Sequence, residues 1–447
     1  MFKKILIANR GEIAVRIIRA CQELGIKTVA IYSAVEKDSM HIRLADEAIC
    51  IGPAASSQSY LNIPAIISAA DITDAEAIHP GYGFLAENPH FAETCTTSGI
   101  TFIGPSPENI RLGGDKAKAL QIMKRKGIPV VPGSDGPLQD ERSILKLIKK
   151  IGVPVILKAS AGGGGKGMKI VYDKKDIEQS YHIVQQEAIA AFGKGELYVE
   201  KYIPEIRHIE VQILADNRGN VIHLGERDCS IQRRHQKLIE ESPYIFANSK
   251  FRKKIGEMAI KAAKTMSYKN AGTVEFIVDN ENKFYFIEIN TRIQVEHPVT
   301  EMVTGIDIIK EQIKLAAGEP LPFKQRDIKF SGHSIECRIN AEDPDSFLPC
   351  PGRITSFIQP GGPGIRVDTA AYHGWVVPAH YDSLIAKVIT HGKDREEAIM
   401  KMRRALREFT IEGIKTTIPF YLKIFDNPDF RNGNFNTSFI EKNNKAK

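Results

Sequence analysis

The sequence has few of the features that mark secreted or membrane-spanning proteins. Its 447 residues contain six cysteines, which form no CxxC pair and no dense framework. We therefore expect free thiols and a reducing compartment. No apolar run approaches the ~18 residues that a membrane span requires, and the apolar start of the chain ends at Asn9. A cytoplasmic protein without a membrane segment is predicted.

The sequence also lacks the basic tracts of nucleic-acid-binding proteins. Its formal net charge is +7, but its 61 lysines and arginines are scattered among 54 acidic residues. There is no zinc-finger spacing and no aromatic–basic RNA motif, so nucleic acid is not an expected partner. The positive charge instead suits anionic small molecules. A length of 447 residues with 43% hydrophobic content predicts two or three domains.

Short apolar strands alternate with helical segments at the start of the chain, which predicts a doubly wound, Rossmann-like parallel sheet. The expected strands are residues 4–9, 28–33, 48–51, 76–79 and 101–103, and the expected helices are residues 11–25, 64–70, 88–98 and 108–127. No GxGxxG follows the first strand, so nothing indicates a dinucleotide site. The segment His79–Asn88 (HPGYGFLAEN) lies where such sheets bind ligands, although its glycines also suit a tight turn.

A glycine-rich segment, Ala161–Gly167 (AGGGGKG), joins the expected strands 153–158 and 169–172. Consecutive glycines let backbone N–H groups cradle phosphate oxygens. The segment is not a Walker A loop, because Gly167 replaces the Ser or Thr and a strand follows. We interpret it as a mobile lid over a nucleotide, with a flexible linker as the alternative.

Polar residues occupy every even position from Glu288 to Glu296. This pattern predicts a strand with one chemical face and one core face. A fully extended strand of that length is too long for one small-molecule site. We therefore expect the chain to bend after Asn290, so that the strand serves one ligand and the following loop another.

Residues 273–279 and 284–288 predict a hairpin with a four-residue loop. In that register Glu275 lies opposite Glu288, and two opposed carboxylates repel each other. Together with Asn290 they make a hard-oxygen site that suits Mg²⁺ bound to nucleotide phosphates. A solvated strand face is the alternative.

Residues 207–213 alternate in the same way and place His208, Glu210 and Gln212 on one face. The next segment, residues 226–237 (ERDCSIQRRHQK), is expected to be a cationic loop. Its Lys237, together with Arg292, could meet a small oxyanion.

The part of the chain from residue 331 onward predicts a C-terminal domain with strands in residues 332–343, 366–368 and 381–388. Its expected helix, residues 394–408, contains Met400-Lys401-Met402, which resembles a biotinyl-lysine acceptor. We reject that interpretation, because an acceptor lysine needs an exposed hairpin tip. The spacing of apolar residues here is helical.

Together the motifs resemble one family, the ATP-grasp biotin carboxylases. The matching segments occur in family order over essentially the whole chain: HPGYGFLAENP, GGGGKGMK, ERDCSIQRRHQK, FIEINTRIQVEHPVTE and ECRINAEDP. The lid departs from the family pattern at Ala161, where a glycine is usual, and at Lys166, where an arginine is usual. The length is similar to that of the stand-alone carboxylase subunit of acyl-CoA carboxylases, without carrier or carboxyltransferase segments.

The resemblance implies a fold of mixed α/β and α+β class. A Rossmann-like N-terminal domain would occupy residues 1–115, and an ATP-grasp domain residues 116–317, with its lid subdomain at about 131–203. A mixed α+β C-terminal biotin carboxylase domain would occupy residues 331–440.

The resemblance also implies roles at matching positions. ATP would contact Lys116, Lys158, Gly163, Gly164, Gly165, Met168, Glu200, Lys201, Tyr202, Ile203, His208, Gln232, His235, Glu275 and Glu288. Magnesium or manganese would bind Glu275, Glu288 and Asn290, and bicarbonate would bind Lys237, Arg292, Gln294, Val295, Glu296 and Arg338. The implied catalytic residues are Arg292, Glu296, Arg338 and Lys237, with Glu296 as the base. Biotin would contact Tyr82 and Arg338, which would stabilise its enolate.

The implied function is ATP- and bicarbonate-dependent carboxylation of biotin on biotin carboxyl carrier protein, through carboxyphosphate. This would be the first half-reaction of acetyl-CoA or acyl-CoA carboxylase, which feeds malonyl-CoA and fatty acid synthesis. The implied partners are the carrier protein, the carboxyltransferase subunits and a second copy in a homodimer. Another ATP-grasp ligase that uses an acyl-phosphate, or a non-catalytic nucleotide-sensing subunit, is the alternative.

Overall fold

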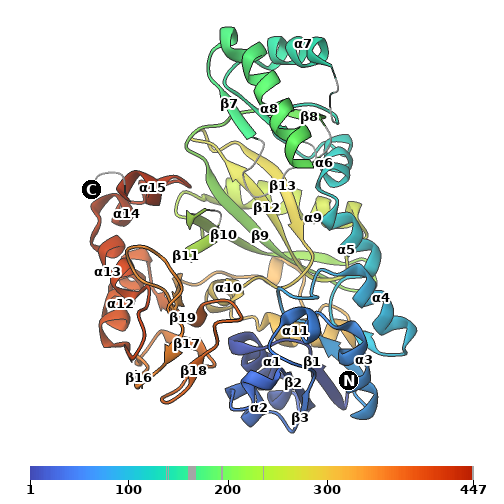
Figure 1. Ribbon diagram of the computed structural model, residues 1–447, viewed down its shortest axis with the longest axis vertical. Helices are drawn as coiled ribbons and strands as arrows, with labels where there is room; N and C mark the ends of the chain where they lie inside the picture. The colour runs from blue at the N-terminus through green and yellow to red at the C-terminus, as the bar shows by residue number, and fades with distance from the viewer. Residues whose placement is uncertain (137, 139, 160–167, 193–194, 235, 445–447) are drawn as a thin grey trace. The chain divides into compact units, whose positions relative to one another are not determined.

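The computed structural model describes residues 1–136, 138, 140–159, 168–192, 195–234 and 236–444. The expected lid glycines Gly163, Gly164 and Gly165 and the expected nucleotide ligand His235 lie outside these residues. The chain forms two compact units (Figure 1). Unit 1 consists of Met1–Gly114, Arg207–Glu275 and Ile289–Lys447, and unit 2 of Asp115–Ile206 and Phe276–Glu288.

The N-terminal part of unit 1 is a parallel sheet of five strands in the order β3-β2-β1-β4-β5. Its strands are β1 (Lys4–Ile7), β2 (Lys27–Tyr32), β3 (Glu47–Cys50), β4 (Ala77–His79) and β5 (Thr101–Phe102), and its helices are α1 (Gly11–Glu23), α2 (Met40–Leu44), α3 (Ile63–Ile72), α4 (Pro89–Thr97) and α5 (Pro107–Gly114). Strands β1, β2 and β3 are labelled in Figure 1. Ile5, Leu6 and Ile7 have no exposed surface, as in parallel strands that are covered on both faces. The predicted Rossmann-like layer is confirmed.

The loop after β4 lies where the strand order of this sheet changes direction, between β1 and β4. Open α/β sheets bind ligands at that point. Asn9 holds the loop, since its Nδ2 donates to Pro80 O at 2.7 Å and to Tyr82 O at 2.8 Å. Gly81 has φ +61°, and a Cβ there would lie 2.9 Å from the Asn9 nitrogen, so the turn requires glycine. A tight turn therefore presents Tyr82.

An eight-stranded sheet follows, with the order β13-β12-β9-β10-β11-β14-β19-β17. Its strands are β9 (Arg207–Ala215), β10 (Val221–Arg233), β11 (Gln236–Ser242), β12 (Asn270–Val278), β13 (Phe284–Asn290), β14 (His333–Asn340), β17 (Ile365–Thr369) and β19 (Leu384–Gly392). The helices along this part of the chain are α9 (Ser249–Thr265), α10 (His297–Thr304), α11 (Ile308–Ala316), α12 (Arg395–Glu408), α13 (Ile418–Asp426), α14 (Pro428–Arg431) and α15 (Phe439–Asn444). Short strands β15 (Gly352–Arg353) and β16 (Ser356–Ile358) pair with β18 (Val376–Val377) and β20 (Thr410–Glu412), respectively.

The segment expected to be a cationic loop is instead largely strand, because residues 226–233 belong to β10 and residues 236 and 237 begin β11. β10 and β11 run antiparallel, with Gln232 opposite Lys237. Glu226 and Arg227 have no exposed surface. The prediction was wrong because buried charged residues fill these strands, so the apolar alternation that marks a strand is absent. Ion pairs with neighbouring side chains make that burial tolerable.

The hairpin of β12 and β13 is present, but its turn differs from the expected one. Asp279 N–H donates to Lys283 O at 2.9 Å, and Asn282 N–H donates to Asp279 O at 3.0 Å. These bonds close a loop over residues 280–282 rather than a four-residue loop, and Asn282 takes the left-handed φ of 58°. The expected opposition of Glu275 and Glu288 no longer follows from the turn and stays a prediction.

The buried face of β13 changes along the strand. The ring of Phe276 contacts those of Phe284 and Phe286, at centroid distances of 5.5 and 6.2 Å. Beyond them the buried residue is Ile289, 3% exposed, so the alternation shifts by one position. β13 ends at Asn290 and α10 begins at His297. The predicted bend after Asn290 is confirmed.

In the C-terminal part, α12 contains the Met400-Lys401-Met402 tripeptide. Ile399, Met402 and Leu406 are at most 1% exposed and form its core face. Lys401 Nζ donates to His391 O at 2.9 Å. The tripeptide is thus part of a packed helix, which is not the setting of a biotinyl-lysine.

Unit 2 contains a three-stranded antiparallel sheet in the order β7-β6-β8. Its elements are α6 (Lys116–Arg125), α7 (Glu141–Ile151), β6 (Val155–Ala159), β7 (Met168–Val171), α8 (Ile177–Phe192) and β8 (Leu197–Lys201). The single helix expected over 108–127 is two helices, because α5 ends at Gly114 and the Asp115 side chain caps α6 by accepting from Lys118 N. No helix in the part of the chain that the structure describes is long and apolar enough to cross a membrane.

Glu301 of α10 joins distant segments of unit 1. Its Oε1 accepts from Arg16 Nη2 of α1 at 2.9 Å, and its Oε2 accepts from Arg366 Nη1 of β17 at 2.7 Å. Burial raises the pKa of Glu301, but Arg16, His297 and Arg366 outweigh burial and lower it to about 2. The ion pairs therefore stabilise the folded chain only while Glu301 is ionised.

The substitution Glu301→Gln should reduce the dependence of the free energy of unfolding on pH in the acid range. Because the folded pKa lies below the ordinary value of 4.5, a stabilisation of roughly 3 kcal/mol is present above that pH and is lost as the pH falls toward about 2. Urea unfolding followed across this range measures it. Glu408→Gln is the control, because Glu408 pairs with Arg404 on the surface and should leave the wild-type profile unchanged. Equal pH slopes for Glu301→Gln and wild type would contradict the assignment.

Candidate active site

Lys237 of β11 contacts three carboxylates in unit 1. Its Nζ donates to Glu210 at 2.6 Å, to Glu296 at 2.8 Å and to Glu275 at 3.1 Å. Burial lowers the pKa of Lys237, but these carboxylates outweigh burial and raise it well above its ordinary value. Lys237 is therefore a permanently charged cation at a fixed position.

Glu296 lies at the N-cap position of α10 and has no exposed surface. One of its oxygens accepts from Lys237, and the other accepts from Arg338 Nη2 at 2.9 Å. Burial raises the pKa of Glu296, but Lys237, Arg338 and Arg227 lower it well below its ordinary value. The positive end of the helix adds to this effect. Glu296 is thus a carboxylate held between two cations.

Arg338 of β14 is oriented from both ends of its guanidinium. Its Nε donates to Glu240 Oε1 at 2.6 Å, while Nη2 donates to Glu296. The backbone is anchored too, because Tyr421 Oη donates to Arg338 O at 2.5 Å. The guanidinium therefore needs little rearrangement to meet an anion beside Glu296.

The loop between β13 and α10, residues 291–296, is held by Glu87 from the motif after β4. Glu87 accepts from Thr291 N at 2.9 Å and from Arg292 Nε at 2.9 Å. Arg292 Nη1 donates to Gln294 Oε1 at 2.7 Å. The side chain of Arg292 is 20% exposed. It is therefore accessible to a ligand while Glu87 fixes its direction.

Glu275 of β12 contacts Asn290, which was predicted to bind a metal with it, and also Gln294 and His208. Its Oε1 accepts from Asn290 Nδ2 at 2.7 Å and from Gln294 Nε2 at 3.2 Å, and its Oε2 lies 2.7 Å from His208 Nε2. Burial raises the pKa of Glu275, but Lys237 and His208 lower it. An ionised carboxylate beside an amide is a hard-oxygen donor set, which fits Mg²⁺.

Tyr82 is connected to the loop through two buried charges. Its hydroxyl donates to Glu12, which also pairs with Lys387 Nζ of β19 at 3.1 Å. Lys387 Nζ donates to Val295 O at 2.8 Å. The Lys387–Glu12 pair therefore connects the carbonyl of Val295 to the phenol of Tyr82.

In unit 2 the expected nucleotide residues form ion pairs. Lys116 lies 2.5 Å from Glu288, and Lys158 of β6 lies 2.5 Å from Glu200 of β8. Lys201 Nζ donates to backbone carbonyls of residues 152 and 153. The other expected residues are Met168, which begins β7 and is 40% exposed, and Tyr202 and Ile203, which follow β8.

The structure thus brings many of the expected residues of unit 1 together. They are Lys237, Glu275, Asn290, Arg292, Gln294, Glu296, Arg338 and His208, while Gln232 is opposite Lys237 in the β10–β11 ladder. Their individual roles stay predictions. Residues that the sequence analysis missed are Glu87, Glu210, Arg227, Glu240, Lys387 and Glu12. Glu87 stood within HPGYGFLAENP, and Glu210 shares the polar alternation of His208, so both carried a detectable signal.

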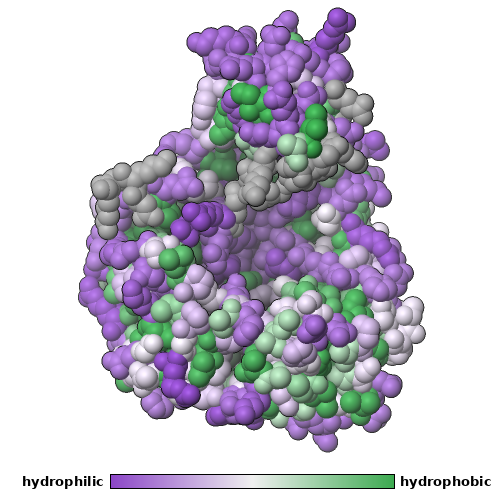
Figure 2. Space-filling model, in the orientation of Figure 1, coloured by the Kyte–Doolittle hydropathy of each residue, from purple (hydrophilic) through white to green (hydrophobic). Residues whose placement is uncertain are grey.

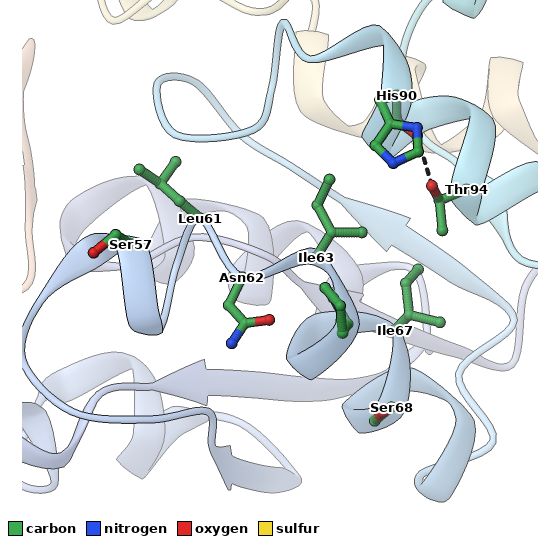
Figure 3. A pocket seen from close by; sticks show the side chains of 9 residues that line it. Ser57, Leu61, Asn62, Ile63, Ile67, Ser68, His90 and Thr94 are labelled. Atoms are coloured by element: carbon green, nitrogen blue, oxygen red, sulfur yellow. Dashed lines mark hydrogen bonds between the residues drawn. The ribbon is translucent and has the colours of Figure 1, made fainter.

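An open pocket on the N-terminal domain, beside α3 and α4, contains none of these residues (Figure 3). It is lined by Ser57, Leu61, Asn62, Ile63, Pro64, Ile67, Ser68, His90 and Thr94. Leu61 and nearby Ile72 are exposed, and apolar surface is visible over this part of the chain in Figure 2. The pocket has no charged cluster, so the candidate active site is the group around Lys237.

That group suits the chemistry of a small oxyanion. Lys237, Arg292 and Arg338 offer cationic N–H donors, and Glu296 offers a carboxylate among them. An anion bound here would accept charge-assisted hydrogen bonds. The same carboxylate is positioned to take a proton from the bound anion.

Three family models match the chain in order. Residues 1–110 match the biotin carboxylase N-terminal domain, residues 115–324 the ATP-binding domain of the carbamoyl-phosphate synthase L chain, and residues 336–442 the biotin carboxylase C-terminal domain. Biotin carboxylase 1 of Bacillus subtilis is 58% identical over 443 residues, with 99% of this chain and 98% of the relative covered.

Solved structures agree with these matches. The biotin carboxylase of Campylobacter jejuni in a β,γ-ATP complex is 56% identical, with a TM-score of 0.92 and 99% of both chains covered. The biotin carboxylase domain dimer of Hydrogenobacter thermophilus 2-oxoglutarate carboxylase, in complex with MgADP, ADP and bicarbonate, is 54% identical, with a TM-score of 0.90 and 99% and 98% covered. Since relatives of this identity extend over the whole chain and the family models cover its N-terminal, central and C-terminal parts, the chain belongs to the biotin carboxylase family.

Proposed function

We propose that the chain carboxylates biotin, using ATP and bicarbonate, and releases ADP and phosphate. The observation that carries this proposal is the carboxylate of Glu296 held between Lys237 and Arg338. A bicarbonate ion requires cationic donors and a proton acceptor in one place, and this arrangement supplies both. The family membership gives the reaction class to which this chemistry belongs.

Bicarbonate would be bound by Lys237, Arg292 and Arg338, with Gln294 and Val295 completing the site. When the anion takes over hydrogen bonds from Lys237 and Arg338, Glu296 loses part of the stabilisation that holds its pKa low. Its affinity for a proton then rises as the anion binds. Glu296 can thus act as a base in the loaded site although it is a weak base in the free chain.

Deprotonated bicarbonate would attack the γ-phosphoryl group of ATP to give carboxyphosphate and ADP. Phosphoryl transfer depends mainly on positioning and charge stabilisation. Lys116 and Lys158 are the proposed phosphate ligands, and the lid, with glycines 163–165 and Met168, would close over ATP. The proposed lining of the adenine and ribose pocket is Glu200, Lys201 and Ile203, assisted by His208, Gln232 and His235, and Tyr202 is a further proposed ATP contact. Bound magnesium or manganese, with Glu275, Glu288 and Asn290 as proposed ligands, would supply charge neutralisation of the phosphates.

Carboxyphosphate would then break down to CO₂ and phosphate, phosphate would take the proton from N1′ of biotin, and the deprotonated nitrogen would add to the CO₂ carbon. The negative charge that develops on biotin would lie beside Arg338, whose guanidinium is already fixed by Glu240. A preorganised cation of this kind lowers the barrier because it does not reorganise during the reaction. Tyr82 is the proposed contact for the biotin ring.

The biotin would be presented by a biotin carboxyl carrier protein, and carboxyltransferase subunits would complete the enzyme. We also propose a homodimer and a cytoplasmic location. Supply of malonyl-CoA for fatty acid synthesis is the proposed use of the product. The relatives include a 2-oxoglutarate carboxylase, and we propose that another subunit selects the final acceptor. A general ATP-grasp ligase shares the central domain match, but the N-terminal and C-terminal matches favour biotin as the substrate.

Trapping of labelled carboxybiotin tests the function directly. The purified chain with ATP, Mg²⁺ and labelled bicarbonate should hydrolyse ATP faster when biotin is added and should transfer label to biotin. A biotinylated carrier domain replaces free biotin in a parallel reaction. ATP hydrolysis that is indifferent to both acceptors would contradict the proposal.

The substitution Arg338→Gln should lower kcat for biotin carboxylation by about 100- to 1000-fold, because the developing anion loses its fixed cation. Binding of ATP, measured by calorimetry, should remain. Arg395→Gln is the matched control, since Arg395 is similarly buried and pairs with Glu241, one residue beyond Glu240. The control should lower stability without changing the dependence on biotin. Loss of ATP binding in Arg338→Gln would overturn the assignment.

The substitution Glu296→Ala should abolish biotin carboxylation, with a loss of at least about 100-fold as expected for removal of a general base. Bicarbonate-dependent ATP hydrolysis should fall with it, because both need the deprotonated anion. Glu311→Ala provides a control, since Glu311 is a buried acid of α11 that pairs with Lys314 away from Lys237. If Glu296→Ala retained bicarbonate-dependent hydrolysis, another group would be the base.

A further inference from the structure

Two carboxyl groups, those of Glu240 and Glu336, lie opposite each other in the strands beside Arg338. Glu240 of β11 lies directly opposite Glu336 of β14 in the antiparallel ladder, and neither has any exposed surface. Side chains of directly opposed residues point to the same face of a sheet, with Cβ atoms about 5 Å apart. Arg338 lies two residues beyond Glu336 on the same strand, so it shares this face.

Among the described residues, one of the four carboxyl oxygens of Glu240 and Glu336 accepts a hydrogen bond. Glu240 Oε1 accepts from Arg338 Nε at 2.6 Å. Glu240 Oε2 and both carboxyl oxygens of Glu336 have no hydrogen-bond partner among the residues that the structure describes. A buried ionised carboxylate without donors is strongly disfavoured, whereas a protonated one is far easier to bury.

Ionisable groups from several elements face the pair. They are Cys229 of β10, Lys237 of β11, Cys337 and Arg338 of β14, Lys387 of β19, Glu296 before α10, Tyr82 after β4 and Tyr421 of α13. Each of these cations pairs with a carboxylate outside the Glu240–Glu336 pair: Lys237 and Arg338 with Glu296, and Lys387 with Glu12, while Arg338 also pairs with Glu240. Burial raises the pKa of Glu240 to about 7, and burial raises that of Glu336 well above its ordinary value. The surrounding positive charge therefore does not keep both carboxyls ionised.

We propose that Glu240 and Glu336 keep at least one proton between them at neutral pH, and that this proton leaves the positive charge of Arg338 available to the reacting anion. The second half of this inference rests on the proposed function. If both carboxyls were ionised, Arg338 would face Glu240, Glu336 and Glu296 as three negative charges, and little net attraction would remain for a further anion. Glu240 and Glu336 touch no substrate in this scheme, so they are positioning residues.

The proton itself is tested by infrared spectroscopy of the purified chain in D₂O at neutral pH, in the C=O stretch of a protonated carboxylic acid. This absorption should be present in wild type and weaker in Glu336→Gln. Glu241→Gln is the matched control, because Glu241 adjoins Glu240 in β11 and is 2% exposed, but Arg395 and His333 hold it ionised. The control should leave the absorption unchanged. Identical spectra for wild type and Glu336→Gln would overturn the proposal.

A second variant covers the case in which Glu336→Gln does not fold. In Glu240→Gln, Glu336 no longer faces a second carboxyl, so its acid absorption should disappear at a lower pH than in wild type. Disappearance at the same pH in both chains would overturn the shared proton.

The consequence for Arg338 is tested by the pH profile of kcat/KM for biotin. An amide at position 336 cannot ionise, so it cannot weaken Arg338 at high pH. The fall of kcat/KM on the alkaline side of the profile should therefore occur at higher pH in Glu336→Gln than in wild type. The ratio of variant to wild-type rate should then rise with pH, by up to about tenfold per pH unit. A purely structural role would change the rate by the same factor at every pH, and a flat ratio would therefore overturn this half of the proposal. Failure of wild type to carboxylate biotin, with the infrared absorption present, would refute the proposed function and leave the proton in place.

Discussion

The contact of Lys237 with Glu210, Glu275 and Glu296 is the interaction on which the rest of the site depends. It joins residues of four segments, β9, β11, β12 and the N-terminal end of α10, around one ammonium group. Without that cation the acidic side chains would repel one another in a region that excludes water. A single buried lysine therefore permits acidic groups to gather where the proposed reaction needs a metal ligand and a base.

In this arrangement the pKa of each ionisable side chain depends on the charges of its neighbours. Glu296 is a weak base because Lys237 and Arg338 bind it, and it becomes a stronger one when an anion competes for those cations. Arg338 in turn is fixed by Glu240. The strength with which Arg338 binds an anion therefore depends on the protonation of that carboxyl. Pairs of side chains set the protonation states in the site. The acidity of one residue therefore cannot be derived without its partner.

The sequence predicted the fold better than the site. The alternation of short apolar strands and helices in the first 103 residues was sufficient for the parallel sheet, because such strands are apolar on both faces. The strands β10 and β11 were missed, since Arg227, Glu226 and Lys237 interrupt the apolar pattern that identifies a strand. Their partners lie in other strands or in the loop before α10, and no local pattern contains that information. Glu240 and Lys387 were missed for the same reason. The bend after Asn290 was predictable from length alone.

Lys387 joins Glu12 to the carbonyl of Val295, and this has a consequence for biosynthesis. Lys387 follows Val295 by 92 positions and Glu12 by 375, so the contact cannot form until most of the chain has been made. Domains generally fold as they emerge from the ribosome, from the N-terminus onward. The N-terminal sheet can therefore fold long before the loop that carries Glu296 receives its anchor. Nascent chains and truncated products that end before β19 should therefore lack this anchor of the loop.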